Sequence, residues 1–175
     1  MIFKKCSVRG RSFGDPATPS EKKEITFVER ERVALVAAMR NTQDEFHEEA
    51  REFVTIMAVC HTVMVDLQFG QLKYSGASPD ELALVEGANS LGIELIARNS
   101  HEIIVHDHFD SADKVYRIVA EFPFDSTRKR MSLLVEINGE YILMTKGADS
   151  AMNPKLEYQP ESRAAKLKWS AKNDI

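Results

Sequence analysis

Five strand-like segments follow one another between residues 93 and 146, and they constrain the fold more than any other part of the sequence. They are rich in β-branched and aromatic residues, and Asn138-Gly139 marks a tight hairpin between the last two. The segments read IELIAR, EIIVHD, KVYRIVAEF, MSLLVEI and EYILMTK. Strands linked mostly by hairpins predict an antiparallel sheet.

The stretch 78–92 has the clearest helix signals before these strands. Ser78 suits the N-cap and Pro79 the first helical position, while Glu81, three residues after the cap, completes a capping box. We expect this helix to run to about Ser90, with Gly92 as its stop.

A second helix is predicted over 44–63, where apolar residues recur at helical spacing and acidic residues favour the N-terminal end. Residues 1–8 and 71–74 suggest short strands, 9–24 a surface loop, and 25–42 a mixed signal that admits a helix. Together these elements predict an α+β domain, with an antiparallel six- to seven-stranded sheet flanked by helices.

The domain organisation follows from the same pass along the chain. We expect one domain over 1–152, in which 9–43 is a partly mobile loop region. Residues 153–175 are polar and weakly periodic, and are expected to form a C-terminal tail or a truncated helical segment.

Composition excludes several classes of function. The net charge of −4 argues against a dedicated nucleic-acid binder. The two cysteines, Cys6 and Cys60, form no disulfide framework and no zinc motif, which favours a reducing, cytosolic setting. No window approaches 18 consecutive apolar residues, so we expect no direct membrane insertion by this chain.

Three segments could carry chemistry, although neither a P-loop nor a GxGxxG motif is present. They are SPDELALVEGA (78–88), FDSTRKRMS (124–132) and MTKGADSAM (144–152). Each has a structural alternative: Glu81 as a capping residue, Phe124 as a packing aromatic, residues 128–130 as edge-strand charge, and Lys146 as a solvated strand end. The functional interpretation is a ring that stacks on a base, with cations nearby for phosphates.

The five histidines form no ligand set, and no spacing supports a Ser/His/Asp or Cys/His arrangement. We therefore predict neither a metal site nor a catalytic residue in this chain.

The three segments, in this order, resemble the nucleotide-binding (N) domain of type IV P-type ATPases, the phospholipid flippases. That family usually reads SPDEGALV, F[ND]STRKRMS and KGAD, where this chain has SPDELALV, FDSTRKRMS and TKGAD. FKKCSVRGRSFGD (3–15) and VTIMAVCHTVMVD (54–66) are similar to flanking stretches of the family. The resemblance covers about residues 1–152 and implies an N-domain-like fold.

The resemblance implies an ATP site. Phe124 would stack on adenine, Glu81 would contact the adenine end, and Lys146 would lie at the base of the pocket. Ser126 and Lys129 would line the pocket near the ribose and phosphates. Magnesium would be needed in the full-length parent protein.

The parent that the resemblance implies is an ATP-driven phospholipid translocase, with this domain at the cytosolic face of a membrane. Its partners would be the phosphorylation and actuator domains, and the phosphorylated aspartate would lie outside this chain. The isolated domain is then expected to bind ATP without hydrolysing it.

Two departures from the family pattern leave alternatives open. Leu82 stands where the family has glycine, and residues 153–175 do not match the segment that usually carries a further arginine contact. One alternative is a regulatory or interaction domain with little or no ATP affinity. Another is a small protein that binds anions through residues 128–130.

Overall fold

The computed structural model describes residues 2–13, 29–157 and 168–169. The elements follow the chain in this order: β1 (Cys6–Val8), β2 (Arg11–Phe13), α1 (Glu29–Arg40), α2 (His47–Val59), β3 (Met64–Gln68), β4 (Gln71–Ser75), α3 (Pro79–Ser90), β5 (Ile93–Arg98), β6 (Glu102–Asp107), β7 (Ala112–Asp125), β8 (Arg130–Ile137), β9 (Glu140–Gly147), α4 (Asp149–Met152), the 3-10 turn η1 (Asn153–Lys155), β10 (Leu156–Glu157) and β11 (Lys168–Trp169).

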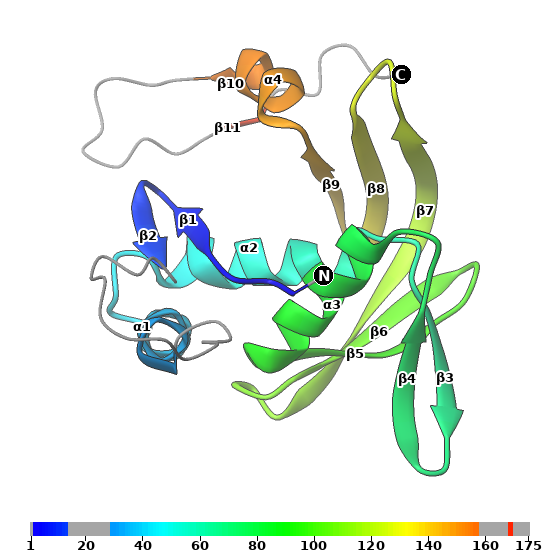
Figure 1. Cartoon of the computed structure of the whole chain (residues 1–175), viewed down its shortest axis with the longest axis horizontal. Coiled ribbons are helices and arrows are strands. Elements are labelled where there is room, and N and C mark those ends of the chain that lie inside the picture. Colours follow the sequence, from blue (N-terminus) through cyan, green and yellow to red (C-terminus); the bar gives the residue numbers. More distant parts are fainter. Residues whose placement is uncertain (1, 14–28, 158–167, 170–175) are drawn as a thin grey trace.

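The central sheet is an antiparallel meander in the order β5-β6-β7-β8-β9 (Figure 1). The α+β class and the antiparallel pairing are confirmed, but this sheet has five strands where six to seven were predicted. The difference arises because β3 and β4 pair with each other in a separate hairpin, as do β1 and β2. The Asn138-Gly139 hairpin is confirmed, with φ of 53° and 84°, the left-handed values that a type I′ turn requires.

Helix α3 forms as its sequence predicts. The Ser78 hydroxyl accepts a hydrogen bond from the Glu81 backbone N–H at 3.3 Å, and Pro79 occupies the first helical position. Gly92 follows the helix with φ of 99°, a conformation that favours glycine. The predicted start and stop are therefore confirmed, but the Glu81 side chain turns to partners outside the helix.

Helix α2 is shorter than the predicted 44–63, since it begins at His47 and ends at Val59. Asp44 lies in the turn before the helix, where its carboxylate accepts the Phe46 backbone N–H at 2.9 Å. Strand β3 begins at Met64, directly after the predicted end of this helix, and was missed although Val65 to Gln68 alternate apolar and polar residues.

The region 9–43 contains strand β2 and helix α1. Burial explains why: Phe13 at the end of β2 and Leu35 and Met39 on α1 are almost fully enclosed in the core. The helical option for 25–42 is confirmed over Glu29–Arg40. Residues 14–28 lie outside the described residues, so the mobility predicted within 9–43 stays a prediction.

The C-terminal segment is described in part. Residues 153–155 form a 3-10 turn, and β10 pairs with β11 in an antiparallel bridge of two residues each. The proposed tail or truncated helix over 158–167 and 170–175 lies outside the described residues.

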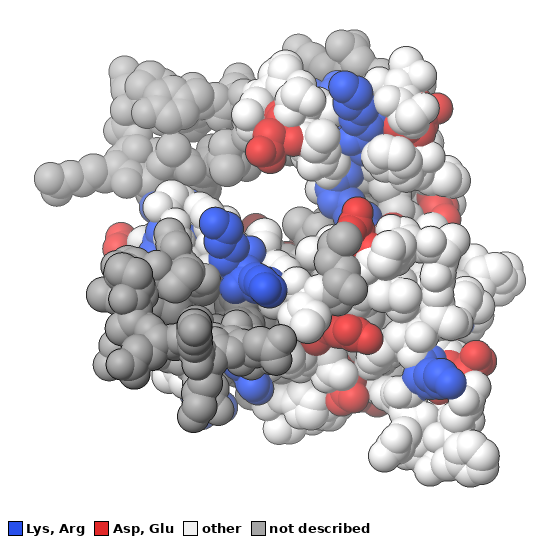
Figure 2. Space-filling view, viewed as in Figure 1, with Lys and Arg blue, Asp and Glu red and all other residues white. Residues whose placement is uncertain are grey.

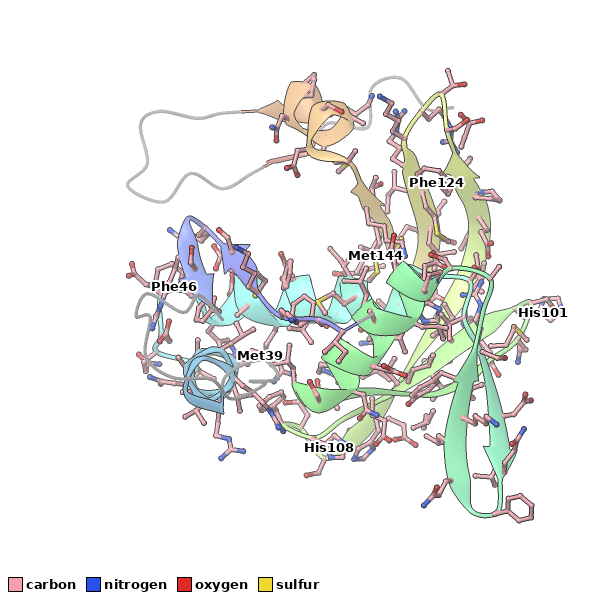
Figure 3. All side chains as sticks on the ribbon, in the orientation of Figure 1. Met39, Phe46, His101, His108, Phe124 and Met144 are labelled. Atoms are coloured by element: carbon pink, nitrogen blue, oxygen red, sulfur yellow. The ribbon has the colours of Figure 1, made fainter. Side chains whose placement is uncertain are left out.

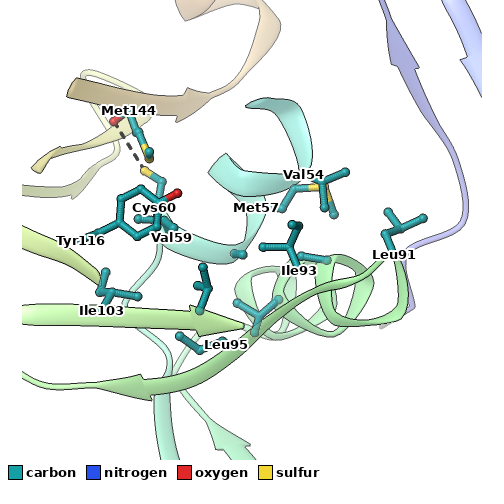
Figure 4. Packing of buried hydrophobic residues seen from close by; sticks show 14 of the residues in the cluster. Val54, Met57, Val59, Cys60, Leu91, Ile93, Leu95, Ile103, Tyr116 and Met144 are labelled. Atoms are coloured by element: carbon teal, nitrogen blue, oxygen red, sulfur yellow. Dashed lines mark hydrogen bonds between the residues drawn. The ribbon is translucent and has the colours of Figure 1, made fainter. Parts of the chain in front are cut away.

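The hydrophobic core lies between the sheet and helices α2 and α3 (Figure 4). Val54, Met57 and Val59 of α2 meet Leu95 and Ile103 of the sheet in this cluster. The Cys60 thiol donates a hydrogen bond to the Met144 carbonyl at 3.6 Å, which joins the end of α2 to β9. Because β7–β9 continue beyond these helices, one end of the sheet extends past the helical layer (Figure 1).

Both cysteines are free thiols. Among the described residues, no helix is both long enough and apolar enough to cross a membrane.

Candidate functional site

Phe124 lies at the end of the sheet that extends past the helices (Figure 3). The pairing of β7 with β8 shifts register between Phe122 and Asp125, so Phe124 has no regular partner across the ladder. Its side chain is 65% exposed, which rules out the core-packing alternative. An exposed ring of this kind is available to stack on a planar ligand.

The turn after Phe124 is held by Asp125. Its carboxylate accepts the backbone N–H groups of Thr127 at 2.7 Å and Arg128 at 2.9 Å, and these two bonds hold the pKa of this carboxyl below its ordinary value. Its carbonyl accepts the Lys129 N–H at 2.6 Å. The turn leaves both Ser126 and Lys129 exposed, as Phe124 is.

The third segment, at the end of β9, is fitted tightly against this turn. Gly147 lies opposite Arg130 in the β8–β9 register. A Cβ on Gly147 would be 2.6 Å from the Arg130 Cβ and 2.8 Å from the Lys129 carbonyl, so only glycine fits here without a shift. The same Lys129 carbonyl accepts the Ala148 N–H at 3.0 Å. The segments 124–132 and 144–152 therefore form one unit.

Glu81 brings the first segment to the other two. The Lys146 ammonium donates to Glu81 Oε1 at 2.7 Å, and the two side chains are 22% and 12% exposed. Glu81 Oε2 accepts both the Thr62 backbone N–H at 3.0 Å and the Thr62 hydroxyl at 2.6 Å. Burial raises the pKa of Glu81, but the hydrogen bonds from Lys146 and Thr62 outweigh it and lower the pKa below its ordinary value. The carboxylate is therefore ionised at neutral pH.

The structure thus brings the five predicted residues to one end of the molecule in two groups. Glu81 and Lys146 are in direct contact, while Phe124, Ser126 and Lys129 share the neighbouring turn. The backbone bond from Ala148 to Lys129 connects the groups.

Sequence reasoning missed two residues of this arrangement. Asp125 orders the turn, and its signal was the Asp-Ser-Thr sequence, which is typical of a side chain that caps its own turn. Thr62 binds Glu81 from 19 residues away, and no spacing signal pointed to it.

Leu82, the departure from the family pattern, does not stand free at this site. It is half-buried and packs against the hydrophobic core.

Cationic side chains gather near the site, with acidic side chains around them, although the whole chain is acidic. Figure 2 shows Lys and Arg side chains in a column over the upper part of β8, with an acidic side chain at its lower end. Lys129 is exposed in the turn before β8, whereas Arg130 is buried and Lys146 pairs with Glu81. Such a column suits an anionic ligand.

Other surfaces offer less chemistry. A groove of about 620 Å³ lies at the opposite end of β8, by the Asn138-Gly139 hairpin, and shares no residue with the predicted set. Within the described ranges, no three His, Cys, Asp or Glu side chains are arranged to hold a metal ion.

Residues 49–168 match the profile of a family described as P-type ATPase, cytoplasmic domain N. The chain belongs to this family. The matched range contains all five predicted site residues, so the geometry described above is part of the N domain itself.

The N domain is similar to parts of several phospholipid-transporting ATPases. It is 34% identical to phospholipid-transporting ATPase IC of Homo sapiens over 168 residues, which cover 89% of this chain and 13% of that protein. It is 34% identical to phospholipid-transporting ATPase DRS2 of Saccharomyces cerevisiae, covering 90% of this chain and 12% of that protein. It is also 34% identical to phospholipid-transporting ATPase tat-1 of Caenorhabditis elegans, covering 94% of this chain and 14% of that protein. The N domain therefore spans only about an eighth of the length of these relatives.

Proposed function

We propose that this N domain binds ATP at the end of β7–β9 and presents it to a phosphorylatable aspartate in a separate domain. The parent protein would be a phospholipid-translocating P-type ATPase, with the N domain at the cytosolic face of its membrane. The phosphorylation and actuator domains would be its partners, and Mg²⁺ would act with ATP in the complete protein.

The observation that carries the proposal is the convergence of three segments that are far apart in the sequence. Glu81 of α3, the turn after Phe124 and the end of β9 are joined by the Lys146–Glu81 ion pair and the Ala148–Lys129 hydrogen bond. Together they offer an exposed aromatic face, hydroxyl groups and ammonium groups, which are the groups that a nucleotide requires.

The residues divide by the part of ATP that each would hold. Phe124 would stack on the adenine, with Glu81 at the same end. Ser126 and Lys129, both exposed in the turn, would face the ribose and phosphates. Lys146 would lie below them, held in place by Glu81. ATP supplies the transferable phosphoryl group, and the domain supplies binding and orientation only.

A second candidate has an observation in its favour. Lys146 is already paired with Glu81, so part of the positive charge at the site is neutralised. A regulatory or interaction domain with little or no ATP affinity would have this property.

Calorimetric titration of the 175-residue chain with ATP separates the two candidates. ATP binding predicts a saturable site with a Kd between the sub-millimolar and millimolar ranges, about −4 to −5 kcal/mol. Phe124→Ala and Lys146→Ala should each weaken it. Phe69→Ala is the matched control, since Phe69 is likewise an exposed phenylalanine but lies at the tip of the β3–β4 hairpin.

Three results would count against ATP binding at this site. The absence of binding at millimolar ATP would favour the regulatory alternative. Binding that survives both site substitutions would place the nucleotide elsewhere. Salt-sensitive binding of RNA or acidic vesicles, with ATP ignored, would favour an anion-binding role for residues 128–130.

A further inference from the structure

We infer that Thr62 is a positioning residue of the nucleotide site: it fixes the Glu81 carboxylate, and through it the Lys146 ammonium, before a ligand arrives. This inference rests on the proposed function. It adds to the site a residue that does not itself touch the nucleotide.

The two oxygens of Glu81 have separate partners. Oε1 accepts the Lys146 ammonium at 2.7 Å, while Oε2 accepts the Thr62 N–H at 3.0 Å and the Thr62 hydroxyl at 2.6 Å. Two donors from one residue fix the plane of the carboxylate. Oε1 is then directed at β9, where Lys146 meets it.

The position of Thr62 is fixed in turn by its neighbours. His61 and Val63 are completely buried, whereas Thr62 between them is exposed. The Val63 N–H donates to His61 Nδ1 at 3.0 Å, so Nε2 carries the proton that is donated to the Ala58 carbonyl at 2.8 Å. The ring thus ties the end of α2 to the start of β3 and holds Thr62 toward Glu81.

Preorganisation is the expected benefit of this arrangement. A lysine side chain loses rotamer freedom when a ligand immobilises it, and that loss opposes binding. In this structure Lys146 is already held by Glu81, and Glu81 by Thr62. Removal of the Thr62 hydroxyl should therefore loosen Lys146 and weaken ATP binding, although the Thr62 side chain makes no contact with the ligand.

Several titratable or charged groups surround the Glu81 carboxylate and could affect its ionisation. Lys146 faces the Glu81 carboxylate from β9. Cys60 and His61 lie close enough to interact electrostatically with Glu81, with Lys146 and with Arg98. Cys60 and His61 are uncharged at neutral pH because burial raises the pKa of the thiol to about 11 and lowers that of the imidazole to about 4. Near neutral pH, Thr62 and Lys146 are therefore the groups that control the Glu81 carboxylate.

The test compares Thr62→Val, which keeps the shape and the backbone N–H but removes the hydroxyl, with Thr62→Ser, which keeps the hydroxyl. By the usual net worth of one ordinary hydrogen bond, Thr62→Val should raise the Kd for ATP about 3- to 10-fold. Thr62→Ser should restore most of the affinity. Thr55→Val makes the same chemical change within α2 and should leave the Kd unchanged.

A second readout separates positioning from a general structural effect. Carboxyl ¹³C NMR should show the pKa of Glu81 higher in Thr62→Val than in the wild type, because one donor to the carboxylate is lost, and normal in Thr62→Ser. A variant that only destabilised the fold would lower the Tm and leave this pKa in place.

The outcomes distinguish this inference from the function on which it rests. A wild-type chain that ignores ATP overturns the proposed function, and this inference with it. A chain that binds ATP and is weakened by Phe124→Ala, but not by Thr62→Val, overturns the inference alone. An unchanged Glu81 pKa in Thr62→Val would also overturn it.

Discussion

Gly147 lies so close to Arg130 across the β8–β9 pair that a Cβ on the glycine would be 2.6 Å from the Cβ of Arg130. The second obstacle, the Lys129 carbonyl at 2.8 Å, is backbone and cannot swing away. Because of this close approach, the end of β9 packs directly against the turn that carries Lys129. The contact therefore affects the geometry of the candidate site as well as that of the sheet.

Gly147→Ala should therefore destabilise the domain by about 1–3 kcal/mol, the usual cost of forcing extra volume into a packed position. Urea denaturation measures this free energy. Gly76→Ala is the control, because its Cβ would meet Val63 at 3.5 Å, which is ordinary contact. Equal stability of the two variants would contradict the prediction.

Gly147→Ala should also weaken ATP binding, because the backbone shift separates Lys146 and Ala148 from the turn. The Kd of the folded variant, measured well below its Tm, checks this. If the Kd were unchanged while stability fell, the close approach would serve the fold alone.

His61 should make the domain sensitive to acid. Burial, followed by the charge of Arg98, lowers its pKa from 6.5 to about 4. Between these values the unfolded state binds the proton and the folded state does not, so the stability contribution is lost as pH falls from about 6.5 to 4. The loss by the lower end is about 3 kcal/mol.

Urea denaturation from about pH 7 to pH 4 measures this loss, and imidazole NMR assigns it to His61. His101→Gln is the control, because His101 is exposed and should leave the pH dependence unchanged. A His61 ring that titrates near its ordinary pKa in the folded protein would contradict the prediction.

Asp107 should stabilise the end of the sheet opposite the candidate site. Its side chain is 2% exposed, and the carboxylate accepts hydrogen bonds from Arg51 of α2 at 2.5 Å and from Lys114 of β7 at 2.6 Å. Asp107→Asn should lower the free energy of unfolding by about 2 kcal/mol, since bonds between charged groups are lost in a buried position.

Asp113→Asn is the matched control for Asp107. Asp113 pairs with His106 at the surface, where its side chain is 56% exposed, and such pairs contribute at most about 1 kcal/mol. ATP affinity should stay the same in both variants, because neither residue lies near the candidate site. A stability loss that is equal in the two would contradict the assignment of Asp107.

The sequence could predict the elements whose signals lie within a few residues. The Asn138-Gly139 turn, the Ser78 cap with Pro79 after it, and the β texture of 93–146 each depend on near neighbours along the chain. The resemblance added the five expected site residues. Strands β2 and β3 were missed, because β2 is only three residues long and the short alternation of β3 follows directly on the apolar end of the predicted helix.

The sequence by itself therefore determined the α+β class, the antiparallel pairing and the segments from which a nucleotide site could be built. Only the tertiary structure decided that Glu81 binds Lys146, 65 residues away, instead of closing its own capping box. It also decided that Thr62 holds that carboxylate and that β3 and β4 stay apart from the central sheet. Local patterns encode local structure, whereas the partner of a side chain depends on which segments the core packs together.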